Sequence, residues 1–279
     1  MRTNCLTACF IGVGILAGSQ ACAATLPHFS RYGVAVDGAE ISYLRRPGAG
    51  PVLVLIPGSL VGADDFAEVV QALDARLSIV IVELRGHGES WPPPRGGTIE
   101  QFASDVLAAV DHAGVKRFYA GGHSIGGMIA IEIAGRRPDA ILGVIAMEGW
   151  THYSVAQDAF GGQNDLTLSV EQQARKTKLR EPVTSRWTKE QIAEFTSIWR
   201  KWNGYEILRT TPVPVLELWG DRRRPQPSLA QMKIPDRPNI EVQWIRGVSH
   251  YLPIESPREA GEAVNRFIER TGRAAPQGR

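Results

Sequence analysis

The chain has 279 residues, of which 43% are hydrophobic and 22% are charged. This composition is typical of a globular chain that buries a sizeable core and is close to the upper size for one domain, and it excludes disordered and fibrous classes. The 31 lysines and arginines nearly balance the 29 aspartates and glutamates, so the formal charge is only +2. Because the charges balance, nothing here predicts a nucleic-acid partner.

The N-terminal segment differs from the rest of the chain. Arg2 is the only charged residue before Arg31, residues 6–17 are apolar or small, and Ala21-Cys22-Ala23 has the small residues that a signal peptidase recognises. This pattern predicts a secretory signal peptide over residues 1–23, since the apolar stretch is too short to span a bilayer stably. We therefore expect cleavage near Ala23, a secreted or periplasmic location and no membrane anchor after cleavage.

All three cysteines, Cys5, Cys9 and Cys22, lie in that segment. Cleavage after Ala23 would leave a mature chain with no disulfide, no thiol nucleophile and no thiolate metal site. A core of this size does not need disulfides, even in an exported protein.

From residue 40 onwards, short apolar runs alternate with stretches of helical periodicity. This alternation is typical of an α/β fold, in which crossover helices bury parallel strands on both faces. The strands are expected at 52–56, 78–82, 117–121, 141–147, 213–219 and 240–245. The helices are expected at 64–77, 98–112, 124–137 and 256–270, with Gly272 as the stop signal of the last one.

A long interruption separates the strand at 141–147 from the strand at 213–219. We interpret it as a helical cap over residues 151–211, inserted between two parts of the core at 24–150 and 212–279. Thr188 and Gln191 form a capping pattern for a helix within it. The helix places four apolar side chains on one stripe, namely Ile192, Phe195, Trp199 and Trp202. The stripe docks the cap onto the core, and some of its aromatic side chains are candidates for the roof of a ligand pocket.

Gly122-His123-Ser124-Ile125-Gly126 is a G-x-S-x-G run between an expected strand and an expected helix. In that context the run predicts a nucleophile elbow, a tight turn that lifts the serine hydroxyl out of the sheet. The helix N-terminus stabilises negative charge nearby. We expect Ser124 to be a nucleophile; the alternative is an inert serine in a glycine-rich turn.

Residues from about 40 to 272 resemble the α/β-hydrolase fold superfamily in its cap-bearing branch. Besides the elbow, the motifs that carry the resemblance are Leu55-Ile56-Pro57-Gly58-Ser59, Arg85-Gly86-His87-Gly88-Glu89-Ser90 and Gly247-Val248-Ser249-His250. The family's usual His-Gly is replaced by Pro57-Gly58. The resemblance implies a mostly parallel central sheet with helices on both faces and an inserted helical cap.

The resemblance also implies roles for individual residues. His250 alone of the six histidines follows the last strand, where the family keeps its catalytic histidine. The expected oxyanion-hole donors are the backbone amides of Ile125 and Ser59, with Leu60 as the fallback for Ser59. The substrate pocket is expected to involve five residues, namely Leu60, His123, Trp150, Trp199 and Trp202.

The pattern leaves two candidates for the third catalytic member, because the family's common acid position falls on Arg223. Asp221 stands two residues before it, next to a run of three arginines. Glu148 ends the strand at 141–147, where some relatives, including haloalkane dehalogenases and zearalenone-type lactonases, carry their acid. We prefer Glu148 as the triad acid and keep Asp221 as the alternative.

The sequence therefore predicts an exported serine hydrolase that cleaves a small-molecule carboxylic ester or lactone through an acyl-enzyme. A serine nucleophile argues against dehalogenase and epoxide hydrolase chemistry, which use a carboxylate at the elbow. The same triad could act on amide, thioester or carbon-carbon bonds, and a ligand-binding protein that lost its triad is the alternative from another class. No motif implies a metal or a cofactor. The pattern does not determine the oligomeric state.

Overall fold

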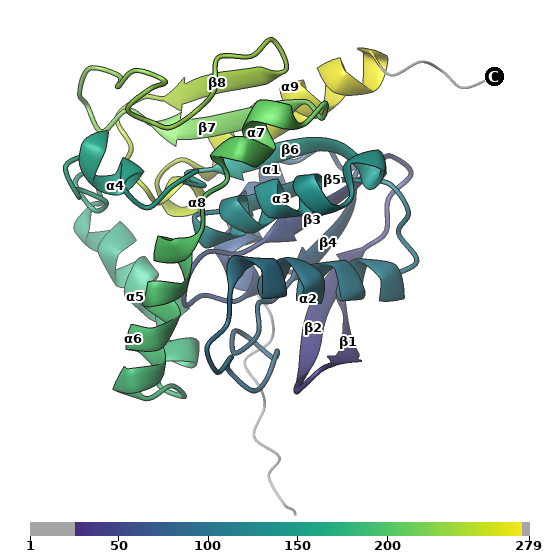
Figure 1. The fold of residues 1–279 in the computed structure, drawn as a ribbon. Helices are drawn as coiled ribbons and strands as arrows, with labels where there is room; N and C mark the ends of the chain where they lie inside the picture. Colours follow the sequence, from purple (N-terminus) through teal and green to yellow (C-terminus); the bar gives the residue numbers. More distant parts are fainter. Residues whose placement is uncertain (1–25, 275–279) are drawn as a thin grey trace, which may run out of the picture.

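The computed structural model describes residues 26–274, so the predicted signal peptide lies outside the described residues. Within them, eight strands form one sheet in the order β1-β2-β4-β3-β5-β6-β7-β8 (Figure 1). The strands are β1 (Ser30–Val36), β2 (Ala39–Arg46), β3 (Val52–Ile56), β4 (Ser78–Val82), β5 (Phe118–His123), β6 (Ile141–Met147), β7 (Val215–Gly220) and β8 (Ile240–Ile245). Strands β1 and β2 run antiparallel to their neighbours, and all other pairs are parallel. The predicted α/β fold with a mostly parallel sheet is confirmed.

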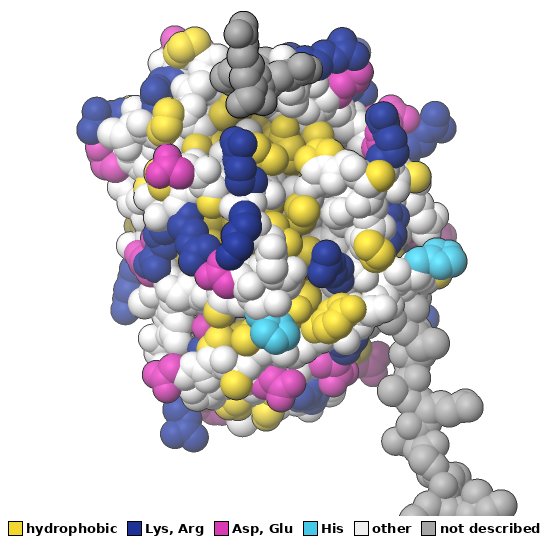
Figure 2. Space-filling model, turned by 90° about the vertical axis from the view of Figure 1, so that its right-hand side faces the viewer, with side chains coloured by type: hydrophobic (Ala, Val, Ile, Leu, Met, Phe, Trp, Pro, Cys, Tyr) yellow, Lys and Arg dark blue, Asp and Glu magenta, His cyan; other side chains and the backbone are white. Residues whose placement is uncertain are grey.

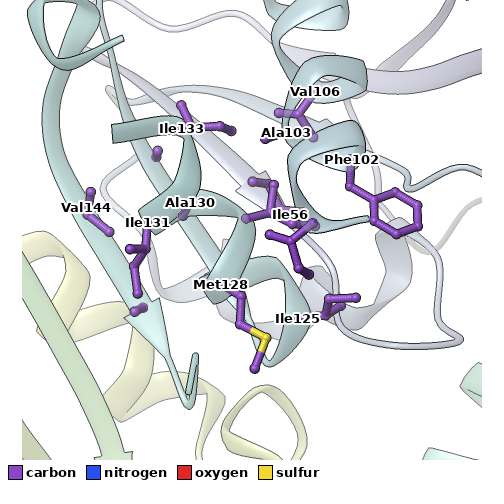
Figure 3. Packing of buried hydrophobic residues seen from close by; sticks show 14 of the residues in the cluster. Ile56, Phe102, Ala103, Val106, Ile125, Met128, Ala130, Ile131, Ile133 and Val144 are labelled. Atoms are coloured by element: carbon purple, nitrogen blue, oxygen red, sulfur yellow. The ribbon is translucent and has the colours of Figure 1, made fainter. Parts of the chain in front are cut away.

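Helices cover both faces of the sheet. The helical segments are η1 (Ala63–Phe66), α1 (Ala67–Ala72), α2 (Ile99–His112), α3 (Ile125–Arg136), η2 (Pro138–Ala140), α4 (Val155–Asp158), α5 (Val170–Thr184), α6 (Lys189–Ile198), η3 (Trp199–Lys201), α7 (Tyr205–Thr210), α8 (Leu252–Glu255) and α9 (Pro257–Ala274). Alternate side chains of β3 enter two separate cores: Val54 and Ile56 pack with α2 and α3, whereas Leu53 and Leu55 pack with α1 and α9. Figure 3 shows Ile56 between α2 and α3, near Phe102 and Met128.

The helix predicted at 64–77 is shorter than expected. It consists of η1 and α1 and ends at Ala72, after which Leu73 is extended. Asn265 of α9 explains the early end, because its side-chain amide donates to the Ala72 carbonyl and its oxygen accepts from the Asp74 amide. A tertiary contact thus satisfies the last turn of the helix.

Two other expectations were wrong or incomplete. Gly272 does not stop the last helix, which continues to Ala274; one glycine costs only about 1 kcal/mol in a helix that packing already holds. The antiparallel hairpin of β1 and β2 was not predicted. Its signal was present, because Asp37-Gly38 lies between the paired residues Val36 and Ala39 and is a favoured two-residue turn.

The inserted cap follows β6 and is formed by α4 to α7, with α5 and α6 at the left of Figure 1. It is anchored to the core through loops and helices. Trp187 Nε1 donates to the Gly86 carbonyl at 2.8 Å, and Arg186 donates to the Gly88 carbonyl at 2.7 Å. Phe195 packs edge-on against Phe102 of α2. Part of the predicted aromatic stripe therefore docks the cap, as expected.

The face turned away from α5 and α6 is shown in Figure 2, where basic and acidic side chains are interspersed around a group of hydrophobic ones. Across residues 26–274, no helix is both long and apolar enough to cross a membrane.

Candidate active site

The G-x-S-x-G run forms a sharp turn from β5 into α3. Ser124 has φ 56° and ψ −121°, a strained backbone conformation for a residue with a side chain. The flanking glycines make this turn possible: a Cβ on Gly122 would lie 2.3 Å from the Gly126 backbone, and one on Gly126 would lie 2.0 Å from the Ile56 carbonyl oxygen. The turn thus brings Ser124 to the end of the central strand of the sheet.

Three side chains from separate strand ends form a continuous chain of hydrogen bonds. Ser124 Oγ lies 3.0 Å from His250 Nε2, and His250 Nδ1 lies 3.2 Å from Glu148 Oε2. Ser124 follows β5, Glu148 follows β6 and His250 follows β8. This arrangement can transfer a proton from the hydroxyl to the imidazole while the carboxylate holds the ring in one orientation.

Glu148 is fully buried and is held by a second group that the sequence did not suggest. Arg222 donates from Nη1 to Oε1 at 2.9 Å and from Nη2 to Oε2 at 2.6 Å, and the Gly220 amide donates to Oε1 at 2.7 Å. The Arg222 guanidinium itself lies over the Phe160 ring at 3.7 Å and is also buried. Burial alone would raise the pKa of Glu148, but Arg222 and His250 outweigh it and lower the pKa to about 2.

The His250 imidazole is buried beneath the cap. Burial lowers its pKa below the ordinary imidazole value, and the hydrogen bond and charge of Glu148 oppose this shift without cancelling it. The ring is therefore predominantly neutral near pH 7, which is the form that can accept a proton. The loop that carries His250 is fixed by Glu255, which accepts hydrogen bonds from the Ser249 amide and hydroxyl and from the Tyr251 amide.

Asp221 contacts the turns that follow β7 and β8. Its Oδ1 accepts from the Arg223 amide at 2.8 Å and from the Gly247 amide at 2.7 Å. It has no hydrogen bond to His250, whereas Glu148 has one. Asp221 therefore holds the turns after β7 and β8 together, and the geometry favours Glu148 over Asp221 as the partner of His250.

The expected oxyanion donors lie at the same place. Ser59, Leu60 and Ile125 all line the cavity in front of Ser124. Ile125 is the first residue of α3, so its amide has no intrahelical acceptor. Leu60 has φ 62°, which marks a tight turn in the loop after β3.

His123 forms a buried pair beside Ser124. Its Nδ1 lies 3.0 Å from Asp65 Oδ2, which also accepts from the Gly58 amide at 3.1 Å, and its Nε2 lies 2.8 Å from the His250 carbonyl oxygen. Burial alone would lower the pKa of His123, but Asp65, together with the His250 carbonyl and Glu148, outweighs burial and raises it. The pair connects the loop after β3 to the loop that carries His250.

A cavity of about 200 Å³ opens in front of Ser124. Four of the five predicted pocket residues line it, namely Leu60, His123, Trp150 and Trp199. Trp202 does not line it, which corrects that prediction: its indole is buried and donates to Glu132 Oε2 at 3.0 Å. The reason is that α6 ends at Ile198, so Trp202 leaves the helical stripe and turns toward α3.

Sequence reasoning missed four residues around the cavity and the carboxylate. Arg222 and Asp65 belong to hydrogen-bonded pairs whose members are far apart in the chain, so no local pattern marks them. Lys176 and Arg180 of α5 also line the cavity. Their four-residue spacing places them on one helix face, and this was the only available signal. Within residues 26–274, no group of three or more His, Cys, Asp and Glu side chains is placed to hold a metal ion.

Comparison with known proteins agrees with the fold described above. The model of the alpha/beta hydrolase fold family matches residues 51–197, and the chain belongs to that family. A curated relative is the dihydrolipoyllysine-residue acetyltransferase component of the acetoin cleaving system from Cupriavidus necator, 31% identical over 109 residues. The match covers 39% of this chain and 29% of that protein, so the chain spans less than a third of that relative's length.

Two solved structures are similar over most of the chain. A bacterial membrane phospholipase A has a TM-score of 0.71 and 23% identity, covering 88% of this chain and 87% of that one. The enol-lactonase from Burkholderia xenovorans has a TM-score of 0.68 and 20% identity, covering 85% of this chain and 100% of that one. At these identities the likeness shows the fold alone.

Proposed function

We propose that the protein is an exported serine hydrolase that cleaves a carboxylic ester or a lactone through an acyl-enzyme on Ser124. The observation that carries the proposal is the hydrogen-bonded chain from Ser124 through His250 to Glu148 at the wall of a cavity. An isolated serine in a glycine-rich turn would not need a neutral imidazole within hydrogen-bond distance of its hydroxyl.

The proposed mechanism assigns each of these side chains one role. Ser124 Oγ attacks the carbonyl carbon while His250 Nε2 takes its proton, and the amides of Ser59 and Ile125 stabilise the oxyanion. The imidazolium gives its proton to the alkoxide oxygen as the carbonyl C–O bond breaks, which leaves an ester on Ser124; the alcohol departs from an ester substrate and stays attached to the acyl chain of a lactone. Water then attacks this ester while His250 takes its proton, the bond between Ser124 Oγ and the acyl carbon breaks, the imidazolium returns the proton to Oγ and the acid is released. Glu148 stabilises the imidazolium in both steps.

Esters and lactones come first because proteins of this fold include ones named as a phospholipase and an enol-lactonase. The same residues could act on amides, thioesters or carbon-carbon bonds, because fold and nucleophile do not fix the substrate. A binding protein without catalysis was favoured only by Arg223 at the usual acid position. Glu148, 3.2 Å from His250, offers a carboxylate in its place and supports the enzymatic proposal.

A fluorophosphonate probe tests the nucleophile directly, because it reacts only with an activated serine. We expect stoichiometric labelling of the mature chain and none of the Ser124→Ala variant. A panel of p-nitrophenyl esters of increasing chain length, run beside lactones and amides, then identifies the bond. Absence of labelling in a folded chain, together with no hydrolysis across the panel, would overturn the proposal in favour of a binding protein.

Export is tested separately. We expect N-terminal sequencing of the protein recovered from periplasm or medium to begin at Ala24. Recovery from the cytosol of an active chain that retains residues 1–23 would contradict the signal peptide and leave the catalytic proposal untouched.

A further inference from the structure

Helix α5 of the cap carries four basic residues that have different surroundings. Arg175 forms an ion pair with Glu68 of α1 and so ties the cap to the core. Lys178 is exposed on the outer surface. Lys176 and Arg180, in contrast, line the cavity that contains the proposed active site. Two of the four basic side chains therefore face the cavity.

Lys176 and Arg180 are four residues apart, so they lie on the same helix face, where two like charges destabilise a helix. Asp165 offsets this only for Lys176, whose Nζ lies 2.6 Å from Asp165 Oδ2 and 4.7 Å from the centre of the Tyr251 ring. For Arg180, no carboxylate of the described residues lies within the 4.0 Å of an ion pair. Arg180 is thus a cavity-lining cation whose charge the described part of the protein leaves unpaired.

We propose that Arg180, supported by Lys176, binds a carboxylate of the substrate, so that the preferred substrate is a small ester or lactone that also carries a carboxylate group. A guanidinium presents parallel N–H donors that match the two oxygens of a carboxylate. The volume of about 200 Å³ favours a short substrate, because drug-sized ligands occupy pockets of roughly 300 Å³ or more. This inference rests on the proposed function of Ser124 for its reaction, but the anion site can be measured without any reaction.

Binding is measured first, in a Ser124→Ala chain that cannot turn over. The probes are monomethyl glutarate and methyl valerate, which have the same chain length and differ in a terminal carboxylate or methyl group. Trp150 and Trp199 line the cavity, so quenching of tryptophan fluorescence reports occupancy. We expect the carboxylate ester to bind about tenfold or more tightly than the neutral one, since a hydrogen-bonded charge is worth about one decade or more of affinity.

The preference should depend on Arg180 and not on cationic charge in general. Arg180→Gln should reduce the affinity for monomethyl glutarate about tenfold and leave the affinity for methyl valerate within about twofold. Arg180→Lys should keep part of the preference. Lys178→Gln removes the same charge from the exposed side of the same helix and should change neither affinity. Equal binding of the two esters, or an equal loss of both in Arg180→Gln at an unchanged melting temperature, would overturn the inference.

Kinetics in the active chain completes the test. The kcat/KM ratio for monomethyl glutarate over methyl valerate should exceed one and should fall about tenfold in Arg180→Gln. Ser124-dependent hydrolysis that favours the neutral ester would refute the carboxylate site and leave the hydrolase proposal standing. Selective binding of monomethyl glutarate in a chain without Ser124-dependent hydrolysis would refute the hydrolase proposal and leave the carboxylate site standing.

Discussion

The two walls of the proposed active-site cavity are built in different ways. On the sheet side, Ser124, His250 and Glu148 follow the ends of β5, β8 and β6, and backbone geometry and buried hydrogen bonds fix them. On the cap side, long side chains from helices line the cavity, including Lys176 and Arg180. The sheet side is suited to a reaction that requires fixed geometry. Substitutions on the cap side, in contrast, can alter substrate selectivity without disturbing that geometry.

The largest expected effect comes from the sheet side. Ser124→Ala and His250→Ala should each lower kcat on a neutral ester by about 10³-fold or more, because the hydrogen-bonded serine, histidine and glutamate act as a unit. The double variant should be no worse than either single variant. Steady-state kinetics with matched melting temperatures measures this, and a single variant that keeps a tenth of the activity would contradict the assignment.

The next effect separates the two carboxylates at neighbouring strand ends. Glu148→Gln should lower kcat about 10²- to 10⁴-fold, because an amide does not stabilise the imidazolium as a carboxylate does. Asp221→Asn should lower it far less, since Asp221 contacts backbone amides of the loops and not His250. The reverse order of losses, measured on the same ester, would make Asp221 the acid.

The acid limb of the pH profile tests the pairing of Glu148 with Arg222. The proposed base must be neutral, and burial lowers the pKa of His250, so kcat/KM should fall on acidification through a pKa below the ordinary value of about 6.5. Arg222 lowers the pKa of His250 further. Arg222→Met removes that positive charge, so the limb should move to higher pH.

Breaking a buried ion pair is costly, so Arg222→Met should also reduce stability by about 3–5 kcal/mol. The profile is therefore measured well below the melting temperature of the variant. Arg223→Met is the matched control, because Arg223 is the exposed neighbour and its substitution should leave the limb in place. An unmoved limb in a folded Arg222→Met chain would contradict the electrostatic role of Arg222.

The smallest effect on rate concerns two tryptophans of the cap. Trp199→Ala should change the relative kcat/KM for short and long esters by a few fold, because Trp199 is a cap residue that lines the cavity and is expected to contact substrate groups remote from the reacting carbonyl. Trp202→Ala should leave this selectivity unchanged and cost about 3–5 kcal/mol of stability, since Trp202 is a buried packing residue. If both variants change the selectivity equally, the distinction between a cavity-lining Trp199 and a packing Trp202 is wrong.

The sequence by itself determined the features that depend on neighbouring residues. The elbow glycines, the alternation of apolar strands with helices and the cap inserted after β6 all come from short-range sterics and periodicity. The strand order of the family then implied that residues after β5, β6 and β8 lie at one edge of the sheet. This is why Ser124 and His250 could be predicted as partners before their distances were known, whereas Glu148 was only preferred over Asp221, which follows β7 at the same edge.

Tertiary structure alone decided which side chains meet when no short-range pattern links them. Arg222 clamps Glu148 from another strand end, Asp65 pairs with His123 across the sheet edge, and Trp202 turns to Glu132 instead of the cavity. The sequence likewise did not indicate that Lys176 and Arg180 face a cavity, because a charged helix face usually faces solvent. These contacts depend on how the cap and the loops pack against the sheet. Burying a charge costs free energy unless its partner is also in place, so such pairs form only in the folded chain.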